Sequence, residues 1–183
     1  MSWRLLELVA SSTFLVPAFA GNERKTRSKA AAPAASSGPR ILLVESHSLI
    51  GSAVGGLIGG PPLGAQVETV ADITYALERL DTQEFDLVVC GLSNPPAKAT
   101  ELVTSLTGRG ATPPIVFLAD AGEEHFLLDS LTSGATGFFT MDVAPRELIA
   151  GLKSVMKGRY TVGTKLKRMA QARIDAEETA PDR

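Results

Sequence analysis

Short apolar runs in the middle of the chain constrain its fold more than any other feature. Ile41–Val44, Phe85–Cys90 and Ile115–Leu118 are nearly continuous in apolar residues, which is typical of strands buried on both faces of a sheet. Between these runs, apolar residues recur at helical spacing, as they do over Leu49–Ile58 and Leu102–Leu106. Strands of this kind that alternate with amphipathic helices predict an α/β domain with a doubly wound parallel sheet.

The alternation continues through five βα units. Asp72 is placed to cap the helix after the second strand, Gly134 to end a helix over residues 123–133, and Pro145 to open the last core helix. We therefore expect a five-stranded sheet over residues 40–160. The expected strands are Ile41–Val44, Ala65–Val70, Phe85–Cys90, Ile115–Leu118 and Gly137–Thr140.

The segments on either side of this domain differ from it in composition. Residues 1–20 form an apolar N-terminal segment, residues 21–39 are interpreted as a flexible basic linker, and residues 161–183 as a charged C-terminal helix and tail. The apolar segment ends in Ala18-Phe19-Ala20, as a secretory signal does, but it is short for a membrane span and basic residues follow it. These features disfavour secretion and membrane contact; a docking helix and a misplaced start stay open as alternatives.

The charge of the chain is unevenly distributed. Residues 41–158 carry six basic and fourteen acidic side chains, whereas residues 1–40 carry six basic and two acidic ones. An acidic central domain is poorly suited to bind the phosphate backbone of DNA, so direct DNA binding is not expected. The single cysteine excludes an internal disulfide, and two histidines form no dense metal cluster, which together favour a reducing, cytoplasmic location.

Five segments, in order and at matching spacing, resemble the receiver domain of bacterial response regulators, especially receivers that precede a LuxR-type helix-turn-helix. They are Ile41–His47, Asp86–Pro95, Pro114–Ala119, Gly134–Asp142 and Pro145–Leu148. The resemblance implies the flavodoxin-like (βα)5 receiver fold, with strand order 2-1-3-4-5, over about residues 40–160. It also implies a role in two-component signal transduction.

A working receiver, as the resemblance implies, moves a phosphoryl group from a histidine kinase to an aspartate at the end of the third strand, with the help of a divalent cation. In this chain Glu45 matches the first of two cation-binding acids, but Ser46 takes the place of the second. Gly91 stands at the acceptor position, Ala119 at that of a hydroxyl residue and Met141 at that of a lysine. Because one carboxylate is a weak magnesium site, we expect no metal and no cofactor. The acceptor side chain is missing, so we expect no aspartyl phosphorylation. No nucleophile–base pair is visible, so we expect no enzymatic activity.

The nearest side chains do not supply the missing chemistry. Asp86 lies at the far end of the same strand as the acceptor position, and Asp120 belongs to a different loop. Cys90 is expected to be a buried apolar residue rather than a redox thiol. His47 is expected at the start of a helix without a ligand role, and Glu45 as a solvated or hydrogen-bonded carboxylate.

Two features bear on interactions with other proteins. Gly51, Gly55 and Gly59 are spaced four residues apart and leave a smooth stripe on one side of the first helix. Because each glycine weakens a helix by about 1 kcal/mol relative to alanine, we interpret the stripe as a docking face for a partner or a second copy, with a tolerated weak helix as the alternative. Phe138 takes the position of an aromatic residue that, in the resembling family, moves with phosphorylation; here it is expected to be fixed by packing.

We therefore predict a pseudo-receiver, a receiver fold that works without phosphorylation as a protein–protein interaction module. Its partner would be a histidine kinase, another response regulator or a second copy in a homodimer. One alternative is a truncated remnant of a LuxR-type transcriptional regulator that modulates an intact relative by mixed dimerisation, because no DNA-binding domain follows before Arg183. Another is a small-ligand sensor, since Gly91, Ala119 and Met141 would widen the crevice at the strand ends.

Overall fold

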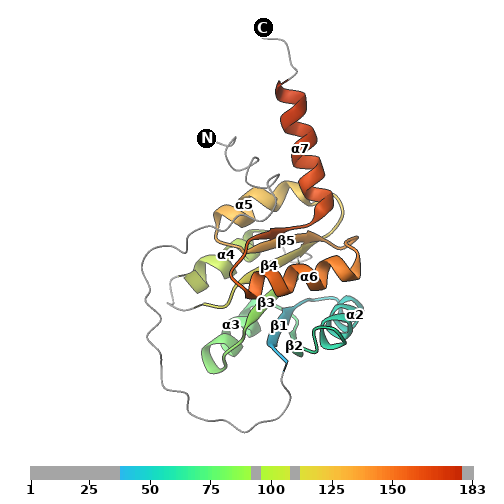
Figure 1. Cartoon of the computed structure of the whole chain (residues 1–183). Helices are drawn as coiled ribbons and strands as arrows, with labels where there is room; N and C mark the ends of the chain where they lie inside the picture. Colours follow the sequence, from blue (N-terminus) through green and yellow to red (C-terminus); the bar gives the residue numbers. More distant parts are fainter. Residues whose placement is uncertain (1–37, 92–95, 108–111, 179–183) are drawn as a thin grey trace.

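The computed structural model describes residues 38–91, 96–107 and 112–178. The predicted N-terminal segment, the linker up to residue 37 and the last residues of the predicted tail lie outside the described residues. Figure 1 shows one sheet with helices on both of its faces, and the C-terminal helix α7 (Thr164–Glu178) extending away from the sheet.

All paired strands of the sheet are parallel, and their order is β2-β1-β3-β4-β5-β6. This order confirms the predicted doubly wound sheet with strand order 2-1-3-4-5. The strands are β1 (Arg40–Val44), β2 (Gln66–Val70), β3 (Leu87–Gly91), β4 (Ile115–Ala119), β5 (Gly137–Thr140) and β6 (Thr161–Val162).

The sixth strand is an addition to the predicted sheet. Gly158, with a φ of 79°, turns the chain after the last core helix. The chain then returns beside β5, where Thr161 pairs with Gly137 and Val162 with Phe138. A strand of two residues carries too little periodicity to be recognised in the sequence, because only its pairing defines it.

Helices form a layer on each face of the sheet (Figure 1). One face is covered by α2 (Ser48–Gly59) and α6 (Pro145–Met156). The opposite face is covered by α3 (Ile73–Thr82), α4 (Pro96–Thr107) and α5 (Leu127–Thr132). The chain adds β2 on one side of β1 and then β3, β4 and β5 on the other, so right-handed crossovers place helices on both faces and bury the central strands.

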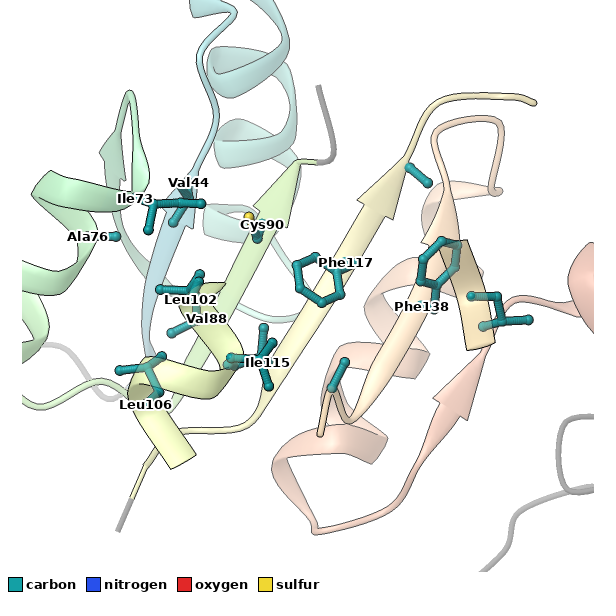
Figure 2. Packing of buried hydrophobic residues seen from close by; sticks show 14 of the residues in the cluster. Val44, Ile73, Ala76, Val88, Cys90, Leu102, Leu106, Ile115, Phe117 and Phe138 are labelled. Atoms are coloured by element: carbon teal, nitrogen blue, oxygen red, sulfur yellow. The ribbon is translucent and has the colours of Figure 1, made fainter. Parts of the chain in front are cut away.

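Successive residues of the central strands enter the two cores alternately. Leu42 and Val88 belong to the cluster under α3, α4 and α5, whereas Leu43 and Val89, the next residues, belong to the cluster under α2 and α6. Figure 2 shows the first cluster, in which Phe117 from β4 lies among side chains from the neighbouring strands and helices. Burial of each large apolar side chain contributes roughly 1.5–3 kcal/mol.

The helix predicted over residues 123–133 is divided in the structure. It begins as a 3-10 turn, Glu124–Phe126, and continues as α5 from Leu127 to Thr132. The backbone N–H of Phe126 donates to the carbonyl of Glu123 at 3.1 Å, an i to i+3 hydrogen bond that spacing in the sequence does not distinguish from the α-helical pattern. The segment ends as predicted near Gly134, whose φ is 111°.

None of the helices within the described residues is long and apolar enough to cross a membrane. The predicted apolar segment, residues 1–20, lies outside the described residues.

Asp72 caps α3, as the sequence predicted. Its Oδ1 accepts a hydrogen bond from the backbone N–H of Tyr75 at 3.0 Å. We expect Asp72→Ala to lower the free energy of unfolding by about 1 kcal/mol, because this N–H loses its acceptor. Urea denaturation measures the change. Asp72→Ser keeps an acceptor oxygen and should lose much less stability, so equal losses in the two variants would contradict the capping role.

Candidate functional site at the carboxyl ends of the strands

The carboxyl ends of β1, β3, β4 and β5 meet along one edge of the sheet. The pairing of Val44 with Cys90 places Glu45 next to Gly91, and the pairing of Ala119 with Thr140 places Met141 beyond β4. The tertiary structure therefore brings together residues that the sequence analysis singled out on separate strands. This edge is the usual ligand-binding side of an open parallel sheet.

Glu45 is the acidic side chain buried at this edge. It is only 4% exposed, and its Oε1 accepts a hydrogen bond from the backbone N–H of His47 at 2.8 Å. The same oxygen lies 3.1 Å from His47 Nδ1, although the imidazole itself is largely exposed. The carboxylate is therefore hydrogen-bonded and shielded from water, rather than solvated.

Gly91 lies directly beside this carboxylate. A Cβ atom built on Gly91 would approach Glu45 Oε2 to 2.1 Å, far inside van der Waals contact. The carboxylate of Glu45 thus occupies the space into which any side chain at position 91 would have to extend.

The other positions of the predicted pocket supply few polar atoms. Ser46 is exposed to solvent, Ala119 is fully buried, and Met141 is half-buried against the core under α2 and α6. The divalent cation implied by the resemblance needs several oxygen ligands, and Glu45 is the one carboxylate in this set. In the described part of the chain, no three His, Cys, Asp or Glu side chains form a group that could hold a metal ion. These pocket positions therefore do not fit a magnesium site.

Neither Asp86 nor Cys90 supplies an accessible nucleophile at the acceptor position. Asp86 precedes β3, at the opposite edge of the sheet, where its Oδ2 accepts the backbone N–H of Arg40 at 2.8 Å. Cys90 is completely buried, and burial together with the nearby charge of Glu45 raises the pKa of its thiol to about 12. The thiol stays protonated at neutral pH, as the interpretation of Cys90 as a small apolar residue requires.

Gly51, Gly55 and Gly59, three of the four glycines of α2, face the strand beside that helix. A Cβ atom on Gly51 would lie 3.3 Å from Thr69 Cγ2, and one on Gly55 would lie 3.8 Å from Val67 Cγ1. A Cβ atom on Gly59 would lie 3.9 Å from another atom of Val67. These contacts explain the glycine stripe within the fold, since small residues let α2 approach the edge strand β2 closely. The docking role of the stripe is still a prediction.

Phe138 is completely buried in β5 and belongs to the same apolar cluster as Val162 and two residues of α7, Leu166 and Ala170. The packing around it is consistent with the expectation of an immobile side chain.

A charged cluster that the sequence analysis did not identify joins α7 to this edge. Lys165 Nζ lies 2.7 Å from Asp142 Oδ2 and 3.4 Å from Glu124 Oε1. Thr140 Oγ1 donates a further hydrogen bond to Asp142.

Hydrogen bonding from Lys165, then from Thr140, lowers the pKa of Asp142, and the hydrogen bond to Asp142 raises the pKa of Lys165. The pKa of Glu124 is also lowered, first by a backbone hydrogen bond and then by Lys165. The three residues come from separate loops and a helix, so no local motif marks them.

A parallel sheet of this strand order, with its candidate site at the carboxyl edge, defines the flavodoxin-like class of folds, to which receiver domains belong. The response regulator receiver domain family matches residues 41–153, which is more than half of the chain. The chain therefore belongs to the receiver domains of two-component response regulators, as its resemblance indicated.

Two solved structures illustrate the likeness in fold. A two-component response regulator of the LuxR family from Aurantimonas sp. SI85-9A1 shares 24% identity, with a TM-score of 0.68 over 75% of this chain and 99% of that chain. A LuxR family DNA-binding response regulator from Silicibacter pomeroyi shares 22% identity, with a TM-score of 0.58 over 68% of this chain and 95% of that chain.

Curated relatives are also response regulators. The DNA-binding transcriptional activator DevR/DosR of Mycobacterium tuberculosis is 24% identical over 144 residues, which cover 78% of this chain and 66% of the relative. The nitrate/nitrite response regulator protein NarL of Escherichia coli is 22% identical over 143 residues, with the same two coverages of 78% and 66%. The chain thus spans about two thirds of the length of these relatives.

The cluster around Lys165 should make stability depend weakly on pH. Because the folded pKa values of Asp142 and Glu124 are lowered, their contribution is present above the unfolded values of 3.8 and 4.5 and is lost as the pH falls below them. The groups are solvent-accessible, so the effect should be small and sensitive to salt. Melting curves of the wild type and Lys165→Gln should differ at neutral pH and converge near pH 3. A difference that persists at low pH would contradict this assignment.

Proposed function

We propose that this chain is a pseudo-receiver, which uses the receiver fold for protein–protein interaction and works without phosphorylation. The observation that carries the proposal is the end of β3, where Gly91 offers no side chain at the acceptor position. The adjacent space holds the carboxylate of Glu45. The pocket of this receiver is therefore filled by the protein itself.

The chemistry of phosphoryl transfer supports this proposal. An acyl phosphate requires a carboxylate that a donor can approach in line, and cationic groups that neutralise the charge on the phosphoryl oxygens. Glu45 is a poor substitute acceptor, because its side chain is only 1% exposed and one oxygen is engaged by His47. Ala119 and Met141 provide neither a hydroxyl nor an ammonium group for the phosphoryl oxygens.

The proposal can be tested by chemical phosphorylation. We expect no mass change when the intact chain is incubated with acetyl phosphate and Mg²⁺, because the acceptor atom is absent. Intact-mass measurement would detect one phosphoryl group as an increase of about 80 Da. A receiver domain that carries the aspartate, treated in parallel, verifies the reagent. A stoichiometric, base-labile adduct on this chain would contradict the proposal.

Without phosphorylation, the state of the domain would be set by differential binding of a protein partner. The candidates are a histidine kinase, another response regulator and a second copy of the chain, acting in the cytoplasm. Direct DNA binding is not proposed, because residues 41–158 are strongly acidic. The relatives described as DNA-binding regulators favour one alternative, in which the chain forms mixed dimers with an intact relative.

The surface of α2 is the interaction face that we propose. This helix contains no charged residue, and Leu49 at its start is 81% exposed. A shallow groove of about 480 Å³ lies between α2 and the edge strand β2, lined by the glycines and by Val67 and Thr69. Charged residues are depleted from the centre of protein–protein interfaces, and the absence of charge on α2 supports this choice of face.

A charge placed on α2 should impair self-association. We expect Leu49→Glu to weaken dimerisation at least about tenfold, since it introduces a desolvated charge into the contact. Light scattering over a concentration series measures the effect. Met169→Glu, on an exposed side of α7, is the matched control and should leave association unchanged. Equal behaviour of the two variants would argue against α2 as the contact face. Gly55→Leu is less suitable, because its side chain would meet β2 within the fold.

The small-ligand alternative concerns the same carboxyl edge. The structure shows a larger cavity of about 670 Å³ at the opposite edge, lined by Arg40, Phe85, Leu106 and neighbouring residues. The carboxyl edge is filled in part by Glu45, which leaves less room than the small side chains alone suggested. Protein interaction is therefore the function that the geometry favours.

A further inference from the structure

Two glycines surround the side chain of Glu45. On the β3 side, a Cβ atom at Gly91 would lie 2.1 Å from Oε2 and 3.1 Å from Cδ of Glu45. On the α2 side, a Cβ atom at Gly51 would lie 3.7 Å from both Cβ and Cγ of Glu45. The stem of the glutamate therefore packs against one glycine, and its carboxylate lies over the other.

Backbone strain does not account for the glycine at position 91. Gly91 is a regular residue of β3, and its pairing with Leu118 continues the ladder with β4. Its φ is not in the left-handed region, so an alanine could adopt the same backbone. The steric demand at this position comes from the Glu45 carboxylate.

We infer that Glu45 is a resident occupant of the acceptor position, and that Gly91 leaves the space for this carboxylate, which a side chain at position 91 would displace. The inference builds on the proposed function, in which the pocket is not phosphorylated. It assigns Glu45 a positioning role, in which a buried anion fixed by the His47 N–H closes the carboxyl edge of β1 and β3. It also couples two features that looked independent in the sequence, a retained acid and a lost acceptor.

One consequence concerns reversion of the acceptor. An aspartate at position 91 would compete with Glu45 for the same space, and the two carboxylates would repel each other at short range. Gly91→Asp alone therefore does not rebuild an acceptor site, since Glu45 must first leave its position.

A double-mutant cycle in the full-length chain tests the coupling. Gly91→Ala should lower the melting temperature by about 3–5 °C in the wild type, because the methyl group displaces a buried, hydrogen-bonded carboxylate. In a Glu45→Ala background the same change should be neutral or slightly stabilising, because alanine restricts the unfolded chain more than glycine does. In a Glu45→Gln background the loss should persist, since the amide fills the same space. Equal effects of Gly91→Ala in all three backgrounds would overturn the inference.

A second measurement covers the case in which Glu45→Ala is too unstable for melting curves. The backbone N–H of His47 donates to Glu45 Oε1, so its NMR resonance should move in Gly91→Ala as it does in Glu45→Gln. An unchanged His47 resonance in Gly91→Ala would show that the carboxylate has not been displaced, and would contradict the inference.

The two proposals fail in different ways. A phosphoryl adduct on the wild type would remove the proposed function, whereas the cycle would still report whether Glu45 and Gly91 share one space. Conversely, additive effects in the cycle would remove the inference and leave the absence of phosphorylation intact.

Discussion

Burial of the central strands on both faces is the constraint from which the rest of this structure follows. Ile41–Val44 of β1 and Leu87–Cys90 of β3 enter the two apolar clusters alternately, so helices must cover both sides of the sheet. The backbone groups of these strands are satisfied within the ladder. Polar side chains are consequently confined to the strand ends and the outer helix surfaces. Any chemistry or recognition must take place there.

At the carboxyl edge, packed side chains occupy positions that the resemblance assigns to a polar pocket. Glu45 is buried beside Gly91, and its neighbours Ala119 and Met141 extend the apolar core towards the same edge. A buried carboxylate is tolerated because hydrogen bonds compensate its lost hydration, here including the N–H of His47. We interpret the edge as a structural element of a signalling fold, which leaves recognition to its helices.

The C-terminal helix is connected to the same edge. Leu166 and Ala170 are buried in the cluster that contains Phe138, and Lys165 pairs with acids of two loops at the strand ends. Apolar burial supplies most of this attachment, because exposed ion pairs contribute little. The first turns of α7 therefore pack as a part of the receiver domain.

The sequence by itself determined the parallel α/β fold, because continuous apolar runs such as Ile41–Val44 and the helical spacing around them admit few other arrangements. It also determined what is missing, since Gly91 has no side chain in any conformation. Only the tertiary structure decided what replaces it: Glu45 directly follows β1 and is far from Gly91 along the chain, and the pairing of β1 with β3 places the carboxylate over the glycine. The same holds for β6 and for Lys165, whose partners are distant in sequence. Local patterns record propensity and burial, whereas contacts between distant segments depend on the packed fold.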